Sequence, residues 1–570
     1  MSSPNSPVET NTDTGVNADT VPATPVNQKR GAFYWFFKNT FGKTWESAKA
    51  NKRTFFVLGL AGLWFTFVFR AYWQPLVIKA RVHTPEMICL VSLLALMVWS
   101  LQRRPHPEAG NGFREAPQKH RRYWKTFFGI FTFTALNVWA HFTMELPPLR
   151  YLTLYLRYQA LDPVVLTELP TTEHERIQPQ ASIRVLGGEA MIEVERVSDP
   201  DFVRIGDEFR WTMAVEPANP GPRIFGGVKQ ILSVSGGASS PNFSGENRIA
   251  VSFRVAEEMY LGKSTDVAVT RSFGLLRFFG YSPRDVKYVK DDNGEWVQVV
   301  SLIKWNGVFF VWPEFGGVQV VRQGRNNPWL TMRSWFLGDG EWVKPEDIHK
   351  HKFLSQQNTV PYEVSRYAAL SLRFQNSFWS PVPWIHKGDI RIPDLPGDLN
   401  DQPFTTYFRF GKGSGGSVED KLYHYFALEP YGYYDKKQGL NTSVFLPADG
   451  VGKAMVYKHY RQSEALTGVS AIAPKVMESN INADWSQSRP VEHRPWIKDI
   501  DGKRRFFWFT NVVTFKDKEN VGDLKYIAGS TPKVMLTDAL YKNVVWVNPN
   551  EPSKWTEEVR EKLGTVWKSN

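Results

Sequence analysis

The first quarter of the chain contains three long apolar runs that carry no Asp, Glu, Lys or Arg. Residues 54–69 read TFFVLGLAGLWFTFVF, residues 87–101 read MICLVSLLALMVWSL and residues 126–144 read TFFGIFTFTALNVWAHFTM. A helix needs about 20 apolar residues to cross the roughly 30 Å hydrocarbon core of a bilayer. The runs therefore predict three transmembrane helices, at about residues 54–73, 86–101 and 126–144.

The first two runs are short for a complete crossing, with 16 and 15 residues. Tyr72 and Trp73 extend the first run, and Arg53 and Arg70 at its two ends are able to reach the membrane interface with their charged groups. The sequence leaves open whether these two helices span the membrane fully. The alternative is that the runs are buried core helices of a soluble protein.

From about residue 165 the pattern changes to short runs rich in Val, Ile, Phe, Tyr and Trp, separated by Gly, Pro, Asn and Asp. This texture is typical of strands and turns. Helical patterns are fewer and predict helices at 149–161, 361–377 and 551–567. The predicted fold class is α+β, with three N-terminal transmembrane helices followed by a large, mainly antiparallel, β-rich extracytoplasmic domain.

The chain divides by composition into four segments. We predict a disordered cytoplasmic tail at 1–30, a membrane domain at 31–145, a β-rich outer subdomain at 146–350 and a second α+β outer subdomain at 351–570. The first of these is rich in Ser, Thr, Asn and Pro without periodicity, as disordered tails are. It has no apolar segment of the signal-peptide type, so the first apolar run is predicted to be an uncleaved signal anchor.

Two stretches of the outer region share an order of features. Residues 283–300 (PRDVKYVKDDNGEWVQVV) and 495–509 (PWIKDIDGKRRFFWF) each place a Pro, an apolar–Lys pair and an Asn-Gly or Asp-Gly step before an aromatic strand. Such steps favour hairpins, because the turn needs positive φ. Further strands follow at 315–321 and 532–547. The second unit partly resembles PepSY-like repeat modules, which are small α+β units on the outer side of membrane-anchored proteins. The alternative is two unrelated hairpins.

The positive charge of the chain is concentrated in the apolar quarter. Of the formal net charge of +12, the first 145 residues carry +9. Lys and Arg number seven before the first run, three in the link between runs one and two, and seven in the link between runs two and three. By the positive-inside rule, the N-terminus and the second link are cytoplasmic and the large C-terminal domain is periplasmic or extracellular. We predict a protein of the cell (inner) membrane.

These basic segments also bear on the binding partner. A basic patch in isolation is compatible with nucleic-acid binding, but between two apolar runs anionic lipid headgroups are the favoured partner. We therefore predict contact with a lipid bilayer and no nucleic-acid binding. The single cysteine, Cys89, excludes an intramolecular disulfide and any cluster of thiolate ligands.

No catalytic signature is found in the sequence. The Gly-rich segment 411–417 lacks the order of a phosphate-binding loop, and Ser530 to Lys533 matches a four-residue serine–lysine pattern without its partner motifs. His349 and His351 form an H-x-H pair beside three lysines, which disfavours a metal. We predict no cofactor and no metal. A pair of carboxylates for glycoside hydrolysis would have to come from residues 388–408, or from Glu478 and Asp484.

Two segments combine aromatic and charged residues in the way that binding surfaces do. One lies at 422–437 and the other at 489–507. The candidate interaction surface consists of Tyr423, Tyr425, Tyr431, Tyr433, Tyr434, Glu492, His493, Arg494 and Trp496. Ordinary sheet edges show the same composition, and that interpretation stays open.

The predicted function is that of a membrane-anchored envelope protein whose outer domain has a structural or partner-binding role, with a protein partner or a second copy of the chain. The alternatives are an enzyme of envelope polymers, such as a glycan hydrolase or transferase, and a membrane protein encoded by a virus or phage. Whether the chain is an enzyme is left open, although the sequence favours a protein without catalytic activity.

Overall fold

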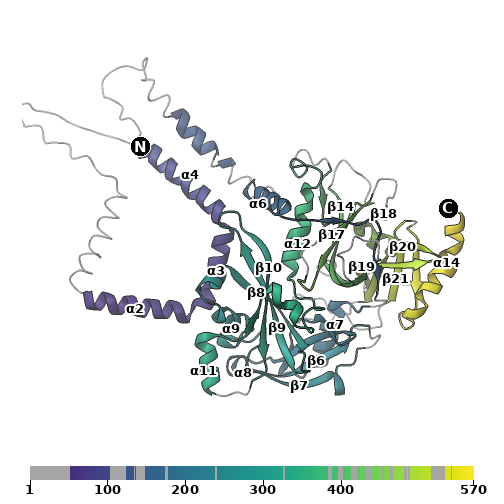
Figure 1. Ribbon diagram of the computed structural model, residues 1–570, viewed down its shortest axis with the longest axis horizontal. Coiled ribbons are helices and arrows are strands. Elements are labelled where there is room, and N and C mark those ends of the chain that lie inside the picture. The colour runs from purple at the N-terminus through teal and green to yellow at the C-terminus, as the bar shows by residue number, and fades with distance from the viewer. Residues whose placement is uncertain are drawn as a thin grey trace, which may run out of the picture.

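The computed structural model shows a β-rich body from which apolar helices project (Figure 1). It describes residues 52–102, 124–133, 135–136, 148–173, 177–237, 241–324, 328–382, 388–395, 402–411, 420–431, 439–451, 455–460, 466–479, 484–485, 488–514, 533–540 and 542–569. The predicted tail at 1–30 and the aromatic segment at 31–50 lie outside the described residues.

The first half of the body contains two antiparallel sheets. A five-stranded sheet has the order β3-β5-β6-β7, with β4 paired to β5, and a four-stranded sheet has the order β11-β10-β9-β8. The strands of these sheets are β3 (Glu195–Val197), β4 (Asp201–Ile205), β5 (Glu208–Pro217), β6 (Val228–Ser235), β7 (Arg248–Phe253), β8 (Tyr281–Lys290), β9 (Trp296–Asn306), β10 (Trp312–Arg322) and β11 (Glu341–Val343).

The second half contains three further sheets. A seven-stranded sheet has the order β1-β17-β16-β14-β13-β2, with β12 paired to β14; a two-stranded sheet joins β15 and β18; and a four-stranded sheet has the order β19-β20-β21-β22. Their strands are β1 (Val164–Val165), β2 (Thr171–Thr172), β12 (Ile390–Arg391), β13 (Phe404–Arg409), β14 (Lys421–Pro430), β15 (Gly439–Leu440), β16 (Thr442–Pro447), β17 (Val456–His459), β18 (Leu466–Thr467), β19 (Ser488–Ile500), β20 (Lys503–Thr514), β21 (Lys533–Asp538) and β22 (Val544–Val547).

Short helices cover these sheets, and longer ones stand at the N-terminal end. The helices are α2 (Lys52–Val68), α3 (Arg70–Val82), α4 (Thr84–Gln102), α6 (Pro148–Gln159), α7 (Gln180–Glu189), α8 (Pro220–Phe225), α9 (Thr265–Ser272), α10 (Leu275–Phe278), α11 (Pro328–Leu337), α12 (Tyr362–Ser371), α13 (Ile472–Glu478) and α14 (Trp555–Ser569). The helices predicted at 149–161, 361–377 and 551–567 are confirmed as α6, α12 and α14.

The strand β9 shows why the body holds together without disulfides. Its first eight residues, Trp296 to Ile303, are buried. Its two faces belong to different hydrophobic clusters, because Val300 and Leu302 pack with α9 while Val297 and Val299 pack with β10 and β11. A strand buried on both faces needs apolar residues at successive positions, and the run WVQVVSLI supplies them.

Both predicted hairpins are confirmed. The chain turns at Asp291–Gly294 between β8 and β9, and at Asp501–Gly502 between β19 and β20. Asp501 and Gly502 have φ of 53° and 72°, as a two-residue hairpin turn with positive φ at both positions requires. The two similar stretches thus open two four-stranded antiparallel meanders, β8 to β11 and β19 to β22.

The seven-stranded sheet joins segments far apart in sequence. The strand β1 pairs in parallel with β17, and β2 pairs with β13. Residues 164–172, which fall in the predicted first outer subdomain, therefore complete a sheet of the predicted second one. Whether the two halves are separate domains stays a prediction.

The prediction of three transmembrane helices is wrong. Among the described residues, no single helix has both the length and the apolar character needed to cross a membrane; only the bent pair Phe56–Val68 and Arg70–Val82 meets these criteria, with an angle of 81° between its helices. With 17 residues, α2 is about 26 Å long, shorter than a bilayer core. In the third run, residues 126–133 and 135–136 are helical, and residues 134 and 137–144 lie outside the described part of the chain.

The first run ends early because the chain turns at Phe69 to bring α3 onto the body. The predicted first helix extends to residue 73, but the chain forms a separate helix, Arg70–Val82, that buries Arg70, Ala71, Gln74 and Ile78. The observed fold is a mixed α/β body of several sheets with projecting apolar helices. The predicted β-rich, mainly antiparallel character is present, but the three membrane spans are not.

Two glycines with similar positive φ give a matched test of the packing. At Gly338 (φ 77°), a Cβ would lie 2.2 Å from the Ala268 carbonyl oxygen of α9, whereas at Gly502 (φ 72°) it would meet no atom within 4 Å. We expect Gly338→Ala to lower the free energy of unfolding by about 3 kcal/mol or more, and Gly502→Ala by about 1 kcal/mol. Urea unfolding followed by circular dichroism measures both. Equal losses would contradict the close packing of residue 338 against α9.

Candidate functional site

The most unusual surface of the protein is the pair of helices α2 and α4, which we call the apolar arm. They extend from the body in different directions and are joined by α3, which lies against it (Figure 1). Thirteen large apolar side chains of the arm are each between 45% and 69% exposed. They are Phe56, Val57, Leu58, Leu60, Leu63, Trp64, Phe65 and Phe67 on α2, and Ile88, Val91, Leu94, Leu96 and Val98 on α4.

The exposed residues of α2 surround the helix. Successive residues of a helix are rotated by about 100°, so Phe56, Val57 and Leu58 alone point in three different directions. Helices of water-soluble proteins carry apolar side chains on one stripe and polar ones on the rest, and helices that are apolar all round are found inside protein cores or membranes. The α2 helix therefore differs from helices of water-soluble proteins in exposing apolar side chains on all its sides.

The first residue of α3, Arg70, fixes the start of this helix to the body. Its guanidinium donates hydrogen bonds to the carbonyl oxygens of Arg271 (2.6 Å) and Phe336 (2.8 Å) in the body. It also donates to the carbonyl oxygen of Phe67 (2.7 Å), near the end of α2. A single buried cation thus joins the last turn of α2 to two segments of the body.

Further contacts continue along α3. The Gln74 amide donates hydrogen bonds to the carbonyl oxygens of Phe278 and Tyr281, and the Trp73 ring packs edge-on against Phe278 at a centroid distance of 4.8 Å. At the other end, Arg81 donates to the carbonyl oxygens of Phe279 and Gly307, both at 2.7 Å. Since α3 is held at both ends, the points at which α2 and α4 leave the body are fixed.

A second unusual feature is a cluster of buried ionisable groups on β4, β5, β8 and the loop before α9. The Lys287 ammonium is 3% exposed and lies 3.6 Å from Asp285 and 3.9 Å from Asp201. Burial lowers the pKa of Lys287, but the two carboxylates outweigh burial and raise it. One ammonium balances only one carboxylate, and burial raises the pKa of Asp201 to about 8 despite the attraction of Lys287.

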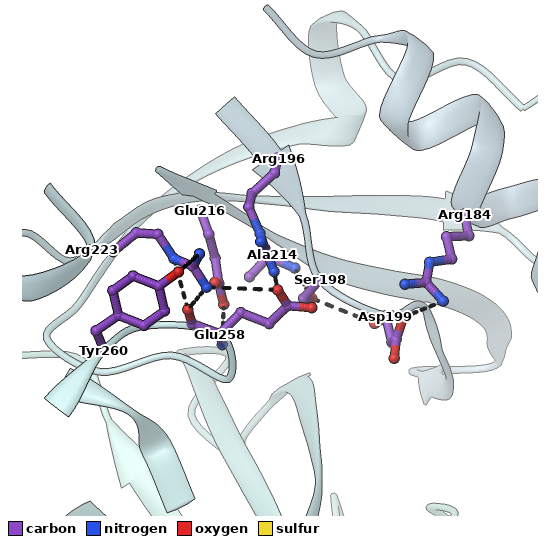
Figure 2. Close-up of polar contacts among 9 residues, drawn as sticks. All are labelled: Arg184, Arg196, Ser198, Asp199, Ala214, Glu216, Arg223, Glu258 and Tyr260. Carbon is purple, nitrogen blue, oxygen red and sulfur yellow. Dashed lines mark hydrogen bonds and ion pairs between the residues drawn. The ribbon is translucent and has the colours of Figure 1, made fainter. Parts of the chain in front are cut away.

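This cluster continues to Glu216, the buried acid at the end of β5. Figure 2 shows its surroundings, in which the backbone N–H of Glu258 donates to Glu216 (3.2 Å) and Arg223 lies 3.8 Å from the Glu258 carboxylate. Arg196 of β3 pairs with the same Glu258 carboxylate. Burial raises the pKa of Glu216 to about 7, although Arg196 and Arg223 oppose the change.

Arg223 is itself held by the loop that follows β7. Its guanidinium lies 3.8 Å from the centre of the Tyr260 ring and donates to the Tyr260 hydroxyl and the Glu258 carbonyl oxygen. Nearby, Arg184 of α7 pairs with Asp199 at 3.0 Å (Figure 2). The arginines therefore pair with Glu258 and Asp199, and they offset the effect of burial on Glu216 only in part.

Three groups in this region each have one oxygen without a hydrogen-bond partner among the described residues. They are the Oε2 atom of Glu257, the Oε2 atom of Glu216 and the hydroxyl of Tyr288. Burial, reinforced by Asp201, raises the pKa of Glu257 to about 9. Glu257 is therefore a neutral acid at pH 7. Acids tuned in this way are typical of proton-transfer sites, but structural clusters show the same shifts.

A buried His424 has neighbours that resemble a nucleophile–base arrangement. Its Nδ1 lies 2.6 Å from the Ser365 hydroxyl and its Nε2 lies 2.6 Å from the Asn358 side-chain oxygen. All three residues are at most 2% exposed. Burial, with Lys287 nearby, lowers the pKa of His424 to about 3, so it is a neutral ring at pH 7. We interpret this network as a satisfied core interaction, because no solvent reaches the hydroxyl.

Two cavities open on the body, and neither brings together a pair of acids. One, of about 600 Å³, lies between α3, α9 and β8, and Asp266 is its only carboxylate. The other, of about 580 Å³, has Glu189 as its only carboxylate. The described residues include no group of three or more His, Cys, Asp or Glu side chains able to hold a metal ion.

Two of the carboxylates considered for glycoside hydrolysis form ion pairs with basic residues, and residues 396–401 of that segment lie outside the described part of the chain. Asp389 is buried and forms a two-bond ion pair with Arg373, at 2.7 and 3.0 Å. Glu478 is exposed and pairs with Lys475.

The predicted interaction residues lie mostly in the interior. Tyr423, Tyr425, His493 and Trp496 are at most 1% exposed. Both tyrosines belong to the core of the seven-stranded sheet, and Trp496 packs under α14. Tyr431 is half-buried, and Tyr433 and Tyr434 lie outside the described residues. The buried members of the set present no surface to a partner in this structure.

Glu492 and Arg494, the other residues of the predicted interaction surface, form an ion pair that links three segments of the chain. A β-bulge separates Val491 from Arg494, and Glu492 within it has φ of 51°. Its carboxylate accepts hydrogen bonds from the Arg494 guanidinium (2.7 Å) and from the backbone N–H of Gln180 at the start of α7 (2.7 Å). Arg494 also donates to the Thr405 carbonyl oxygen (2.9 Å). The pair thus connects β19, α7 and β13.

Sequence reasoning missed the acid cluster and the role of Arg70. A weak signal for the cluster exists at Lys287, which stands within the apolar strand segment Val286–Val289. Glu216 similarly ends the apolar run of β5. Charged residues inside buried strands are rare unless paired, so their positions indicate an internal ion pair.

Comparison with known proteins gives no match: no protein-family model, no curated protein and no solved structure is similar to this chain. The partial resemblance to PepSY-like modules therefore stays an interpretation of the sequence.

The raised carboxyl pKa values predict a stability that falls as pH rises. A buried acid whose folded pKa lies above its unfolded value of about 4.5 retains a proton that the unfolded chain loses, so unfolding becomes easier between about pH 5 and pH 9. We expect Glu257→Gln to flatten this decline and to raise the free energy of unfolding at pH 8 by about 2 kcal/mol, with little change at pH 5. Urea unfolding across this range measures it.

The exposed Glu189 provides the control, because Glu189→Gln removes a carboxylate without changing the cluster. A Glu257→Gln variant whose pH profile parallels that of the control would show that Glu257 is ionised in the folded protein.

Proposed function

We propose that this chain is a membrane-attached envelope protein in which the apolar arm inserts into lipid and the β-rich body has a structural or partner-binding role. The observation that carries the proposal is the exposure of large apolar side chains on every side of α2 and on most of α4. The proposal requires insertion of the arm and does not require that any single helix cross the membrane.

Lipid suits the arm better than a protein groove does. A groove covers one stripe of a helix, whereas lipid chains surround it. Transfer of a large apolar side chain out of water is favourable by about 1.5–3 kcal/mol when burial is complete. The α2 helix alone has eight such side chains. A groove that covered one stripe would leave the others in water, and their transfer free energy would not contribute to binding.

The charges beside the arm support the same conclusion. Lys52 and Arg53 precede the apolar run of α2, and Lys79 and Arg81 precede α4. Basic residues next to apolar segments are attracted to anionic lipid headgroups, each by about 1 kcal/mol near the surface.

The body supports a structural or binding role more than a catalytic one. Each of the two cavities has a single carboxylate, and Asp201, Glu216 and Glu257, whose pKa values burial raises, line neither of them. The candidate partner is a second copy of the chain or another envelope protein.

Flotation with vesicles tests the attachment. We expect the full chain to float with vesicles of phosphatidylcholine and phosphatidylglycerol, and the triple variant Leu60→Glu, Leu63→Glu, Phe67→Glu to float at least tenfold less, because three charges oppose insertion. The matched control is Val165→Glu, Met477→Glu, Leu540→Glu, which changes exposed apolar residues of the body. Equal flotation of the two triple variants would refute attachment through the arm.

The mass of the particle in mild detergent tests the role of the body. If the body assembles with itself, light scattering corrected for detergent gives a multiple of 65.4 kDa. A strict monomer over the accessible concentration range would count against self-association and leave a different protein as the partner.

A further inference from the structure

The body has an exposed apolar surface of its own, at both ends of α3. On α11, the side chains of Trp329, Met332 and Leu337 are 66%, 49% and 57% exposed. In the turn between β9 and β10, Val308 is 81% and Phe309 is 55% exposed. We call these two groups together the flanking patch.

The α11 group forms a single stripe. Residues 329, 332, 333, 336 and 337 follow the spacing of one helical face, and on this face only Arg333 is charged. The end of the helix is held to the body, since Gly338, which follows α11, fits directly against the α9 backbone. An outward stripe of Trp, Met and Leu next to an Arg has the composition of a helix that lies in a membrane interface.

Hydrogen bonds from α3 connect the flanking patch to the apolar arm. Arg70, which caps the end of α2, donates to the carbonyl oxygen of Phe336 in α11 (2.8 Å). Arg81, just before α4, donates to the carbonyl oxygen of Gly307, next to Val308 (2.7 Å). One part of the patch therefore lies where α2 leaves the body, and the other where α4 leaves it.

The charges around the patch also suit a membrane surface. Arg333 and Lys79 are exposed beside it. The nearest acid in the sequence, Asp339, forms an ion pair with Arg254 at 2.7 Å. Both α3 and α11 thus carry an exposed basic group, as contact with anionic headgroups requires.

We propose that the flanking patch is the bilayer-facing side of the body, with the α11 stripe and the Val308–Phe309 turn inserted among the headgroups of anionic lipid. This inference rests on the proposed membrane attachment and adds to it a defined orientation. Insertion of the arm alone does not say which side of the body faces the membrane, whereas contact at both ends of α3 defines that side.

Site-specific fluorescence in vesicles tests the orientation. The background is the full chain with Cys89→Ser, and single cysteines are introduced by Met332→Cys on α11, Met477→Cys on α13 and Leu63→Cys on α2, each labelled with a nitrobenzoxadiazole dye. Met332 and Met477 are a matched pair, because both are exposed methionines of the body, at 49% and 42%. The vesicles contain phosphatidylcholine and phosphatidylglycerol, with or without lipids that carry a nitroxide at the headgroup level.

The expected result is a blue shift and nitroxide quenching at positions 332 and 63, and neither at 477. A response at 63 without one at 332 would overturn the orientation and leave the membrane attachment standing. No response at either position would overturn both. Equal responses at 332 and 477 would refute a preferred side. A blue shift at 332 that grows with protein concentration and is not quenched by the nitroxide would indicate a second copy on this patch, which also overturns the proposal.

A variant that introduces two negative charges on the α11 stripe provides a second measurement. Trp329→Glu with Leu337→Glu alters two exposed side chains, so circular dichroism is expected to be unchanged. Quenching at position 332 should fall at least twofold, while quenching at position 63 remains. Unchanged quenching at 332 would contradict insertion of the α11 stripe.

Discussion

The arrangement of this protein depends on one buried guanidinium. The Arg70 guanidinium donates hydrogen bonds to carbonyl oxygens of α2, α9 and the last turn of α11. Three segments, the most distant of them 266 residues from Arg70, therefore meet at one cation. Hydrogen bonds from a charged donor are about twice as strong as neutral ones, and three carbonyl acceptors compensate a cation that burial would otherwise disfavour. Because Arg70 fixes where the helix changes direction, it also fixes how the apolar arm is presented.

The interior of the body contains a cluster of buried acids around a single lysine. Lys287 is balanced by Asp285, and further acids nearby are held partly or wholly neutral by burial. Keeping acids protonated avoids the cost of burying unpaired charge, but it makes the fold sensitive to proton concentration. The arginines of the adjacent surface pair with Glu258 and Asp199 instead, so in the deep part of the cluster Lys287 is the cation paired with acids, and Glu257 is kept neutral by a proton.

Local sequence signals predicted much of this structure. The positive φ required at Asp501 and Gly502 could be inferred from the Asp-Gly step, and the helical periodicity of α12 and α14 is present in the sequence. The break at Phe69 could not be inferred, because its cause lies in carbonyl groups more than 200 residues away. For the same reason the acid cluster was hidden: Asp201, Glu216 and Lys287 stand on different strands and become neighbours only in the folded sheets.

The pairing of β1 with β17 has a consequence for the synthesis of the chain. Val164 is matched with Val456, so the seven-stranded sheet cannot close until almost 300 further residues have left the ribosome. Contacts at such sequence separation are slow to form, and the apolar arm emerges well before them. During that interval the nascent chain exposes its most aggregation-prone segment without a finished body. Early binding of the arm by a membrane or a chaperone would therefore protect the chain from aggregation until β1 pairs with β17.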